Sequence, residues 1–491
     1  MFVITEKYDC IRKGSLTSGN KKVETPCFFM TSDFGGGGTN VSRLLVYSDI
    51  FINTNLQLLM NYYYLDINSD LEPRFDTGLI KELQNYDDIG EFIQYIKMKY
   101  LTGSPKKAVS KFKYDVEKIW NPIFLLDSGS GNILRGMIKR RELTHDNYKQ
   151  EYEKTIKNYF EFATSKKFDI LIAIDFAGKN TLKDNEMSDT NYVDGVNEFS
   201  SNEKNLELLR LTLNFMKQEK PNINVLAPVH GKSPKEYEDY TREILELEKV
   251  LEIRFSGFAI GGLGNPNQID REIWGISNKV NGRVKAANYL IKIVTIIRKI
   301  LNENNDNRLI HVLGAASPYN LLPLIYAGCD TFDCHSAWRR ASDGNNNSKS
   351  CVFNNDNLKK LLSQKQTVSF SKMVVPLLGP DTIIAENNKK YLEFVDLNLY
   401  NYKCSCEVCK KMSLEDLKKL YCGTDEENYY AKILIYFHNV LQYDYICQRT
   451  RNMINDKKTI KDFIDSIPES QYKNDMLEAM FLNKSKNLLD Y

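Results

Sequence analysis

Eight short apolar runs, separated by longer segments with helical spacing, constrain the fold of this chain more than any other feature. Most of the runs are rich in Ile, Val, Leu or Phe, and none alternates cleanly between polar and apolar residues. This is typical of parallel strands that are buried on both faces. The runs are PCFFMTS (26–32), DIFINTN (49–55), PIFLLDSG (122–129), FDILIAIDFAG (168–178), INVLAPVHG (223–231), RFSGFAIGG (254–262), RLIHVLGAAS (308–317) and CDTFDC (329–334).

Amphipathic helices are predicted between several of these runs. The clearest cover residues 143–165, 199–218, 233–250 and 280–303, and Ser233-Pro234 is a good start for the third of them. Strand and helix units that alternate eight times predict an α/β fold, a (β/α)₈ TIM barrel. A doubly wound open sheet is the alternative that the pattern alone leaves open.

The bulk composition excludes some classes of protein. The chain has 491 residues, 42% hydrophobic and 26% charged, with a formal net charge of +2, so no field over the whole chain indicates nucleic acid or membrane. The opening MFVITEKYDC lacks the features of a signal peptide, and no run reaches the roughly 18 apolar residues of a membrane span. We therefore expect a cytoplasmic protein without membrane contact, whose ten cysteines are thiols or metal ligands.

Polar residues and glycines gather where the predicted strands end. Asp127, Asp175, His230 and Asp333 lie at or just past the carboxyl ends of four different runs. The loops at these ends converge in a barrel, and active sites are found there. A single carboxylate after a strand is usually a turn residue. Three carboxylates and a histidine at matching ends favour a site.

The sequence CSCEVC places Cys404, Cys406 and Cys409 within six residues, and His438 follows after a helical stretch. Three thiolates and an imidazole form the tetrahedral set that zinc prefers in closed structural sites. Four protein ligands leave no open position, so we expect this zinc to stabilise the structure. The alternatives are reduced thiols with a helix histidine, or Cys422 as a competing ligand.

Composition changes after the barrel, which suggests two parts. We expect a catalytic barrel domain over residues 1–400, and a zinc-binding subdomain with a helical C-terminal tail over residues 401–491.

Five motifs, in order from about residue 25 to residue 440, resemble those of the tRNA-guanine transglycosylase superfamily. Together they cover most of the chain. They are TPCFFMTS (25–32), LLDSGSG (125–131), FSGFAIGGL (255–263), AGCDTFDC (327–334) and CSCEVC with a later His-Asn.

The resemblance implies a (β/α)₈ barrel with a zinc-bearing insertion. It also implies that the protein exchanges guanine in a nucleic acid for a free 7-deazaguanine base. Asp333 matches the family's nucleophile, Asp127 its general base and Asp175 the residue that reads the guanine edge. A homodimer is also implied. The residues that match the base pocket or fall within it are Ser128, His230, Gly261, Gly262 and Leu263, with His230 where most tRNA enzymes have glutamine.

Chemistry argued from the residue types agrees with these roles. Cleavage of an N-glycosidic bond passes through an oxocarbenium-like state that a carboxylate stabilises and captures, and a double displacement retains the anomeric configuration. A second carboxylate handles protons on the two bases. Because neighbouring carboxylates repel each other, we expect a raised pKa for Asp127 or Asp175.

The stretch HSAWRRASDG (335–344) departs from the tRNA enzymes. With Asp333 before it, the pattern resembles the DNA-guanine transglycosylase branch, so DNA is favoured over tRNA as the polymer, with partner proteins of a modification system as candidates. Trp338 would stack on a base exposed by flipping, and Arg339 and Arg340 would bind phosphate, although Trp338 packing under a loop is the alternative. A non-catalytic nucleic-acid-binding subunit and a guanine-releasing hydrolase are the other functions left open.

Overall fold

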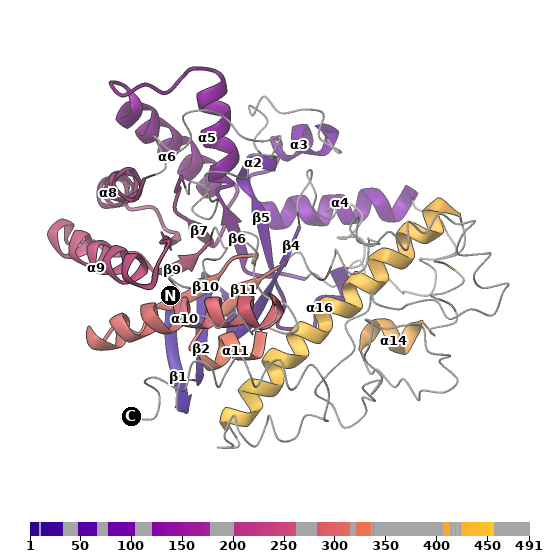
Figure 1. Ribbon diagram of the computed structural model, residues 1–491. Coiled ribbons are helices and arrows are strands. Elements are labelled where there is room, and N and C mark those ends of the chain that lie inside the picture. The colour runs from indigo at the N-terminus through magenta and orange to yellow at the C-terminus, as the bar shows by residue number, and fades with distance from the viewer. Residues whose placement is uncertain are drawn as a thin grey trace.

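The computed structural model shows eight parallel strands closed into a barrel, with helices around it (Figure 1). It describes residues 1–8, 11–32, 48–65, 77–103, 120–176, 201–261, 282–314, 321–334, 337, 406–412, 416, 420 and 424–455. Neighbouring barrel strands follow one another in the chain, and the last pairs with the first, so the predicted (β/α)₈ barrel is confirmed and the open sheet is excluded. The strands are β4 (Cys27–Thr31), β5 (Gln57–Asn61), β6 (Phe124–Asp127), β7 (Ile170–Ile172), β8 (Asn224–Val229), β9 (Gly257–Ile260), β10 (Leu309–Val312) and β11 (Thr331–Asp333).

Seven of the eight predicted runs contain a barrel strand, but the second prediction, 49–55, was wrong. Residues 48–51 form the 3-10 helix η1 (Ser48–Phe51), and the strand follows at 57–61. The Thr54 hydroxyl donates a hydrogen bond of 2.7 Å to the carbonyl of Phe51, and such local bonds compete with sheet pairing. Phe51 is buried from this turn, packed against Trp120 and Phe437.

The four predicted helices are present, with ends shifted by a few residues. They are α6 (Tyr148–Ser165), α8 (Asn202–Glu219), α9 (Pro234–Leu251) and α10 (Gly282–Glu303). Ser233 caps α9, since its side chain accepts a hydrogen bond from the N–H of Glu236. The other helices are α2 (Tyr62–Leu65), α3 (Thr77–Leu83), α4 (Ile89–Gly103), α5 (Ser130–Lys139), α11 (Leu321–Tyr326), α14 (Glu407–Lys411) and α16 (Asp425–Asn455).

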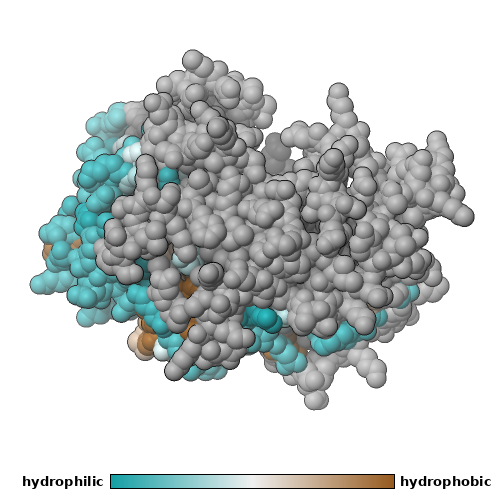
Figure 2. Space-filling view, turned by 60° about the horizontal axis from the view of Figure 1, so that its bottom comes forward, coloured by the Kyte–Doolittle hydropathy of each residue, from teal (hydrophilic) through white to brown (hydrophobic). Residues whose placement is uncertain are grey.

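Charged residues lie on exposed helix faces; on α9, for example, Lys235 pairs with Asp239. On the face shown in Figure 2, the coloured part of the surface is mostly hydrophilic, with small hydrophobic areas. None of the helices in the described ranges is both long and apolar enough to cross a membrane.

A three-stranded antiparallel sheet that the sequence analysis did not predict precedes the barrel. It consists of β1 (Phe2–Tyr8), β2 (Ile11–Ser18) and β3 (Lys21–Thr25). Its Leu16 and Val23 belong to the same buried cluster as the residues that fill the barrel interior. Residues of this sheet also pair with residues at the starts of barrel strands. Lys21 Nζ, for example, forms an ion pair with Asp169 Oδ2 at 2.7 Å. It therefore covers the amino-terminal end of the barrel and leaves the carboxyl end to the site.

The long helix α16 lies against β4 and shares a hydrophobic core with the barrel (Figure 1). Tyr436 donates a hydrogen bond of 3.0 Å to the carbonyl of Thr31, and the ring of Tyr443 packs on Phe28. The division into residues 1–400 and 401–491 stays a prediction, with α16 in contact with both proposed parts.

Candidate active site

Side chains that end the barrel strands point into the mouth of the barrel. Phe29, Leu59 and Leu125 are buried together in the barrel interior. Successive side chains alternate between the two faces of a strand, so the residues two positions further on face the same way. Those residues are Thr31, Asn61 and Asp127, and their polar groups replace the apolar interior at the carboxyl end of the barrel.

Asp333 ends β11 and is only 3% exposed. Its Oδ1 accepts a hydrogen bond of 2.9 Å from the N–H of Gly314, and Thr31 Oγ1 donates to its Oδ2 at 3.3 Å. Gly314 has a φ of 64°, in the left-handed region that glycine adopts without strain, and this conformation accompanies the N–H bond to the carboxylate. His311 Nε2 lies 3.4 Å from Asp333 Oδ1.

Asp127 ends β6, and Asn61 donates a hydrogen bond of 2.8 Å to its Oδ2. Burial, followed by repulsion from Asp175 and Asp333, raises the pKa of Asp127 to about 7, although the backbone N–H groups of Gly129 and Ser128 oppose the shift. The three carboxylates are therefore close enough to influence one another. The expectation of a raised pKa holds for Asp127, which can bind or release a proton near neutral pH.

Asp175 follows β7 by three residues and has two polar neighbours. Ser130 donates a hydrogen bond of 2.8 Å to its Oδ1, and His230 Nε2 lies 2.6 Å from its Oδ2, without the alignment of a hydrogen bond. Asn205 on α8 fixes the adjoining backbone, because its side chain bonds both the N–H and the carbonyl of Phe176. The loop after β7 thus presents Asp175 toward Ser130 and His230.

The remaining predicted site residues fall into two groups. Ser128 is fully buried directly after Asp127, and Gly261 follows β9, so both lie at the carboxyl end of the barrel. Gly262, Leu263, Trp338, Arg339 and Arg340 lie outside the described residues.

Sequence reasoning missed several residues that contact the three carboxylates. Asn61 was missed because the second strand was placed too early, although it is a polar residue that ends an apolar run. His311 lies inside the run 308–317, and a histidine within an otherwise apolar strand was an available signal, although its inward orientation was not. Thr31 and Ser130 had no distinctive pattern around them.

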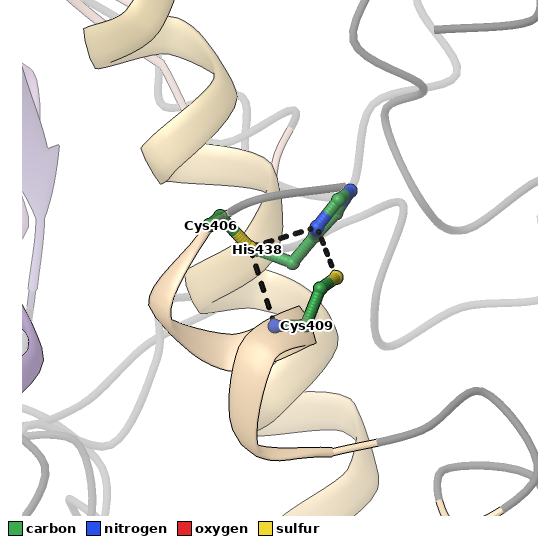
Figure 3. Close-up of side chains that lie close together, drawn as sticks. All are labelled: Cys406, Cys409 and His438. Carbon is green, nitrogen blue, oxygen red and sulfur yellow. Dashed lines mark hydrogen bonds between the residues drawn. The ribbon is translucent and has the colours of Figure 1, made fainter. Parts of the chain in front are cut away.

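A second cluster lies on α14 and α16, where Cys406, Cys409 and His438 converge (Figure 3). His438 Nδ1 is 3.4 Å from the sulfur of Cys406 and 3.3 Å from that of Cys409. A tetrahedral ion with ligand bonds of about 2.0 to 2.3 Å separates its ligand atoms by roughly 3.5 Å, so these three atoms fit one. The N–H of Cys409 also donates a hydrogen bond of 3.4 Å to the Cys406 sulfur, which helps to hold that sulfur in the cluster.

These three residues could therefore hold a metal ion. The fourth predicted ligand, Cys404, lies outside the described residues. The three residues belong to α14, its N-terminal cap and α16, and none of them ends a barrel strand or contacts one of the three carboxylates in the described residues.

The fold and these two sites define a class: a (β/α)₈ barrel with a carboxylate-lined mouth and a cysteine–histidine cluster on the helices that follow the last strand. Comparison with known protein families shows to which family of this class the chain belongs. The chain belongs to the family described as queuine tRNA-ribosyltransferase, whose model matches residues 9–473.

One relative is the queuine tRNA-ribosyltransferase of Buchnera aphidicola subsp. Schizaphis graminum (strain Sg). It is 22% identical to this chain over 249 residues, which cover 51% of the chain and 50% of the relative. The match thus spans about half the length of this curated relative.

Proposed function

We propose that the chain exchanges guanine in a nucleic acid for a 7-deazaguanine base through a covalent aspartyl–sugar intermediate. The observation that carries this proposal is the mutual proximity of Asp127, Asp175 and Asp333 at one end of the barrel, in a chain of the queuine tRNA-ribosyltransferase family.

Asp333 is the proposed nucleophile. Its carboxylate forms a bond to C1′ of the target nucleoside as the bond from C1′ to the guanine nitrogen breaks, and the electron pair leaves with the base. The departing base takes up a proton, and the protonated form of Asp127 supplies it. In the second half, Asp127 accepts a proton from the incoming base, whose nitrogen attacks C1′ and releases Asp333. A pKa of about 7 suits Asp127 for both transfers.

Asp175 is the proposed reader of the base. A carboxylate accepts hydrogen bonds from the N1–H and amino group of guanine, which adenine cannot offer in the same arrangement. His230, at 2.6 Å from Asp175, orients that carboxylate and stands where the tRNA enzymes that the sequence resembles have glutamine. The proposed pocket is completed by Ser128, Gly261, Gly262 and Leu263.

DNA is the proposed polymer. The sequence pattern from Asp333 to Gly344 supports it, with Trp338 as a stacking residue and Arg339 and Arg340 as phosphate contacts. Exchange in tRNA is the second candidate, and the name of the family and of the bacterial relative favours it.

Zinc is the proposed occupant of the cysteine–histidine cluster, held by Cys404, Cys406, Cys409 and His438. Two thiol sulfurs and an imidazole nitrogen within tetrahedral reach support this choice of metal. With four protein ligands, the ion would stabilise the contact between α14 and α16.

An exchange assay tests the proposal. Purified protein is incubated with a labelled 7-deazaguanine base and either duplex DNA or tRNA, and the label in each polymer is counted. We expect label in DNA, and an Asp333→Asn variant that retains its fold but loses exchange by at least about a thousandfold, because an amide cannot form the ester. The control is Asp239→Asn, which alters an exposed carboxylate on α9.

Each result is informative. Label in tRNA alone would replace the polymer and keep the mechanism. Undiminished exchange by Asp333→Asn would remove the mechanism, and release of guanine without any incoming base would indicate a hydrolase.

A further inference from the structure

The geometry points to His311 as a positioning residue that donates an N–H from Nε2 to Asp333 Oδ1 and so leaves Oδ2 as the oxygen that bonds to the sugar. This inference rests on the proposed function, because it assigns the two oxygens of the proposed nucleophile to different tasks. No role was predicted for His311 from the sequence.

Contacts on two sides fix the imidazole of His311. Its Nδ1 lies 2.9 Å from the hydroxyl of Thr331, two residues before Asp333 on the same strand. The ring of Phe29 meets it edge-on, with centroids 5.6 Å apart and an interplanar angle of 89°. His311 itself is fully buried. The direction in which Nε2 points is therefore set by the barrel interior.

Within the described residues, Nε2 of His311 has no aligned hydrogen-bond partner, and its nearest acidic atom is Asp333 Oδ1 at 3.4 Å. Buried polar atoms without partners are rare and costly. A small closing movement of the Asp333 carboxylate would turn this contact into a hydrogen bond, as catalytic contacts often tighten when a substrate binds. The Thr331 hydroxyl can donate to Nδ1, which leaves the proton of a neutral ring on Nε2.

The two oxygens of Asp333 are held unequally. Among the described residues, Oδ1 has the backbone N–H of Gly314 at 2.9 Å and His311 beside it, whereas Oδ2 has the single, longer bond of 3.3 Å from Thr31. The less strongly bonded oxygen keeps the more available lone pair. When Oδ2 forms the bond to C1′ and the base departs with the electron pair of the broken bond, Oδ1 becomes the carbonyl oxygen of the ester. Gly314 and His311 then hold that carbonyl oxygen in place.

Two substitutions separate this role from simple packing. His311→Gln keeps a side-chain N–H donor, whereas His311→Phe keeps a planar ring and removes the donor. We expect His311→Phe to lower kcat of base exchange about 10- to 100-fold, as the loss of one hydrogen bond to a charged group implies, while KM for the polymer and for the base changes by less than about twofold. His311→Gln should recover most of the lost kcat.

The second measurement does not depend on activity. Selective ¹⁵N labelling of the five histidines reports which ring nitrogen of His311 carries a proton, with His311→Gln identifying its signals. We expect a proton on Nε2, and a shift of that signal in the Asp333→Asn protein. Thr331→Val should weaken this preference, because it removes the hydroxyl next to Nδ1.

A bare Nε2 with the proton on Nδ1 would overturn the inference, as would His311→Phe with a kcat within about threefold of the parent protein. Equal losses for His311→Gln and His311→Phe would also overturn it, since they would indicate packing alone. A parent protein that exchanges no base would instead refute the proposed function, and the proton position on His311 would still decide whether it donates to Asp333.

Discussion

At the scale of single residues, the environment decides what each carboxylate can do. The motif AGCDTFDC contains two aspartates three positions apart, and the barrel gives them opposite tasks. Asp330 precedes β11, fully buried between Arg12 at 3.3 Å and Arg298 at 2.9 Å, and helps to join β2 and α10 to the barrel. Asp333 ends the same strand, about 10 Å away for a strand that rises by about 3.3 Å per residue. One stabilises the fold and the other faces the site.

The raised pKa of Asp127 predicts how stability depends on pH. The carboxyl has a pKa of about 7 in the folded protein and an ordinary value of 3.8. The Asp127 carboxyl therefore makes its full contribution to the stability of the folded protein below pH 3.8, and this contribution is lost as the pH rises through 7. The total change in the free energy of unfolding is at most about 4 kcal/mol. Asp127→Asn cannot ionise, so it should gain stability relative to the parent protein between pH 4 and pH 8.

Urea midpoints at both pH values measure this difference. Asp239→Asn, on the exposed face of α9, is the control and should follow the parent protein. Stability curves for Asp127→Asn and the parent that stay parallel across the pH range would contradict the raised pKa.

Site residues could be predicted from the sequence where an aspartate or a histidine comes at the end of a predicted strand. Asp127, Asp175, His230 and Asp333 all follow apolar runs, so convergence at one barrel end could be predicted. Partners such as Thr31 and His311 belong to the strands themselves, and only their inward orientation, which depends on register, brings them to the carboxylates.

At the scale of elements, the runs that form buried parallel strands could be found because both of their faces are apolar. The charged N-terminal strands, such as β1 with the sequence FVITEKY, escaped notice because only part of each strand is buried. The position of β5 was missed because η1, just before it, also buries apolar side chains such as Phe51. Burial alone does not distinguish a strand from a turn of helix.

The cluster on α14 and α16 predicts a zinc content that depends on particular cysteines. Replacement of Cys409 by Ser should remove bound zinc and lower the melting temperature, since structural zinc contributes directly to folding. Cys404→Ser should have the same effect if Cys404 is the fourth ligand, whereas Cys422→Ser should retain the metal. Metal analysis of the purified proteins, together with thermal unfolding with and without a chelator, measures both quantities.

An equal zinc content in the parent and the Cys409→Ser protein would refute the assignment. A loss of zinc from Cys422→Ser but not from Cys404→Ser would exchange the fourth ligand and keep the site.

At the scale of the whole molecule, the two ends of the barrel serve different purposes. The sheet β1–β3 covers the amino-terminal end with Leu16 and Val23, whereas the carboxyl end carries the acids. Barrel enzymes commonly divide stability and chemistry in this way. The register of eight strands, set by their apolar interiors, decides which side chains reach the mouth.

Leu16→Ala tests this division. Leu16 is 3% exposed, and its truncation should lower the free energy of unfolding by about 2 to 4 kcal/mol. The kcat of the proposed base exchange should stay within about twofold of the parent value at a temperature where the variant is folded. Val3→Ala, which alters an exposed residue of the same sheet, is the matched control for denaturant unfolding and kinetics. A tenfold fall in kcat for Leu16→Ala would show that the two ends are coupled.

Asn439 follows the cluster residue His438 directly on α16, and it donates a hydrogen bond of 3.0 Å to the carbonyl of Ala337, four residues after Asp333. A change in the cysteine–histidine cluster can therefore affect the chain that follows β11 through this hydrogen bond. Oxidation of those two thiols would change the surroundings of His438, and with them the neighbouring contact between Asn439 and Ala337 that ties α16 to the segment after β11.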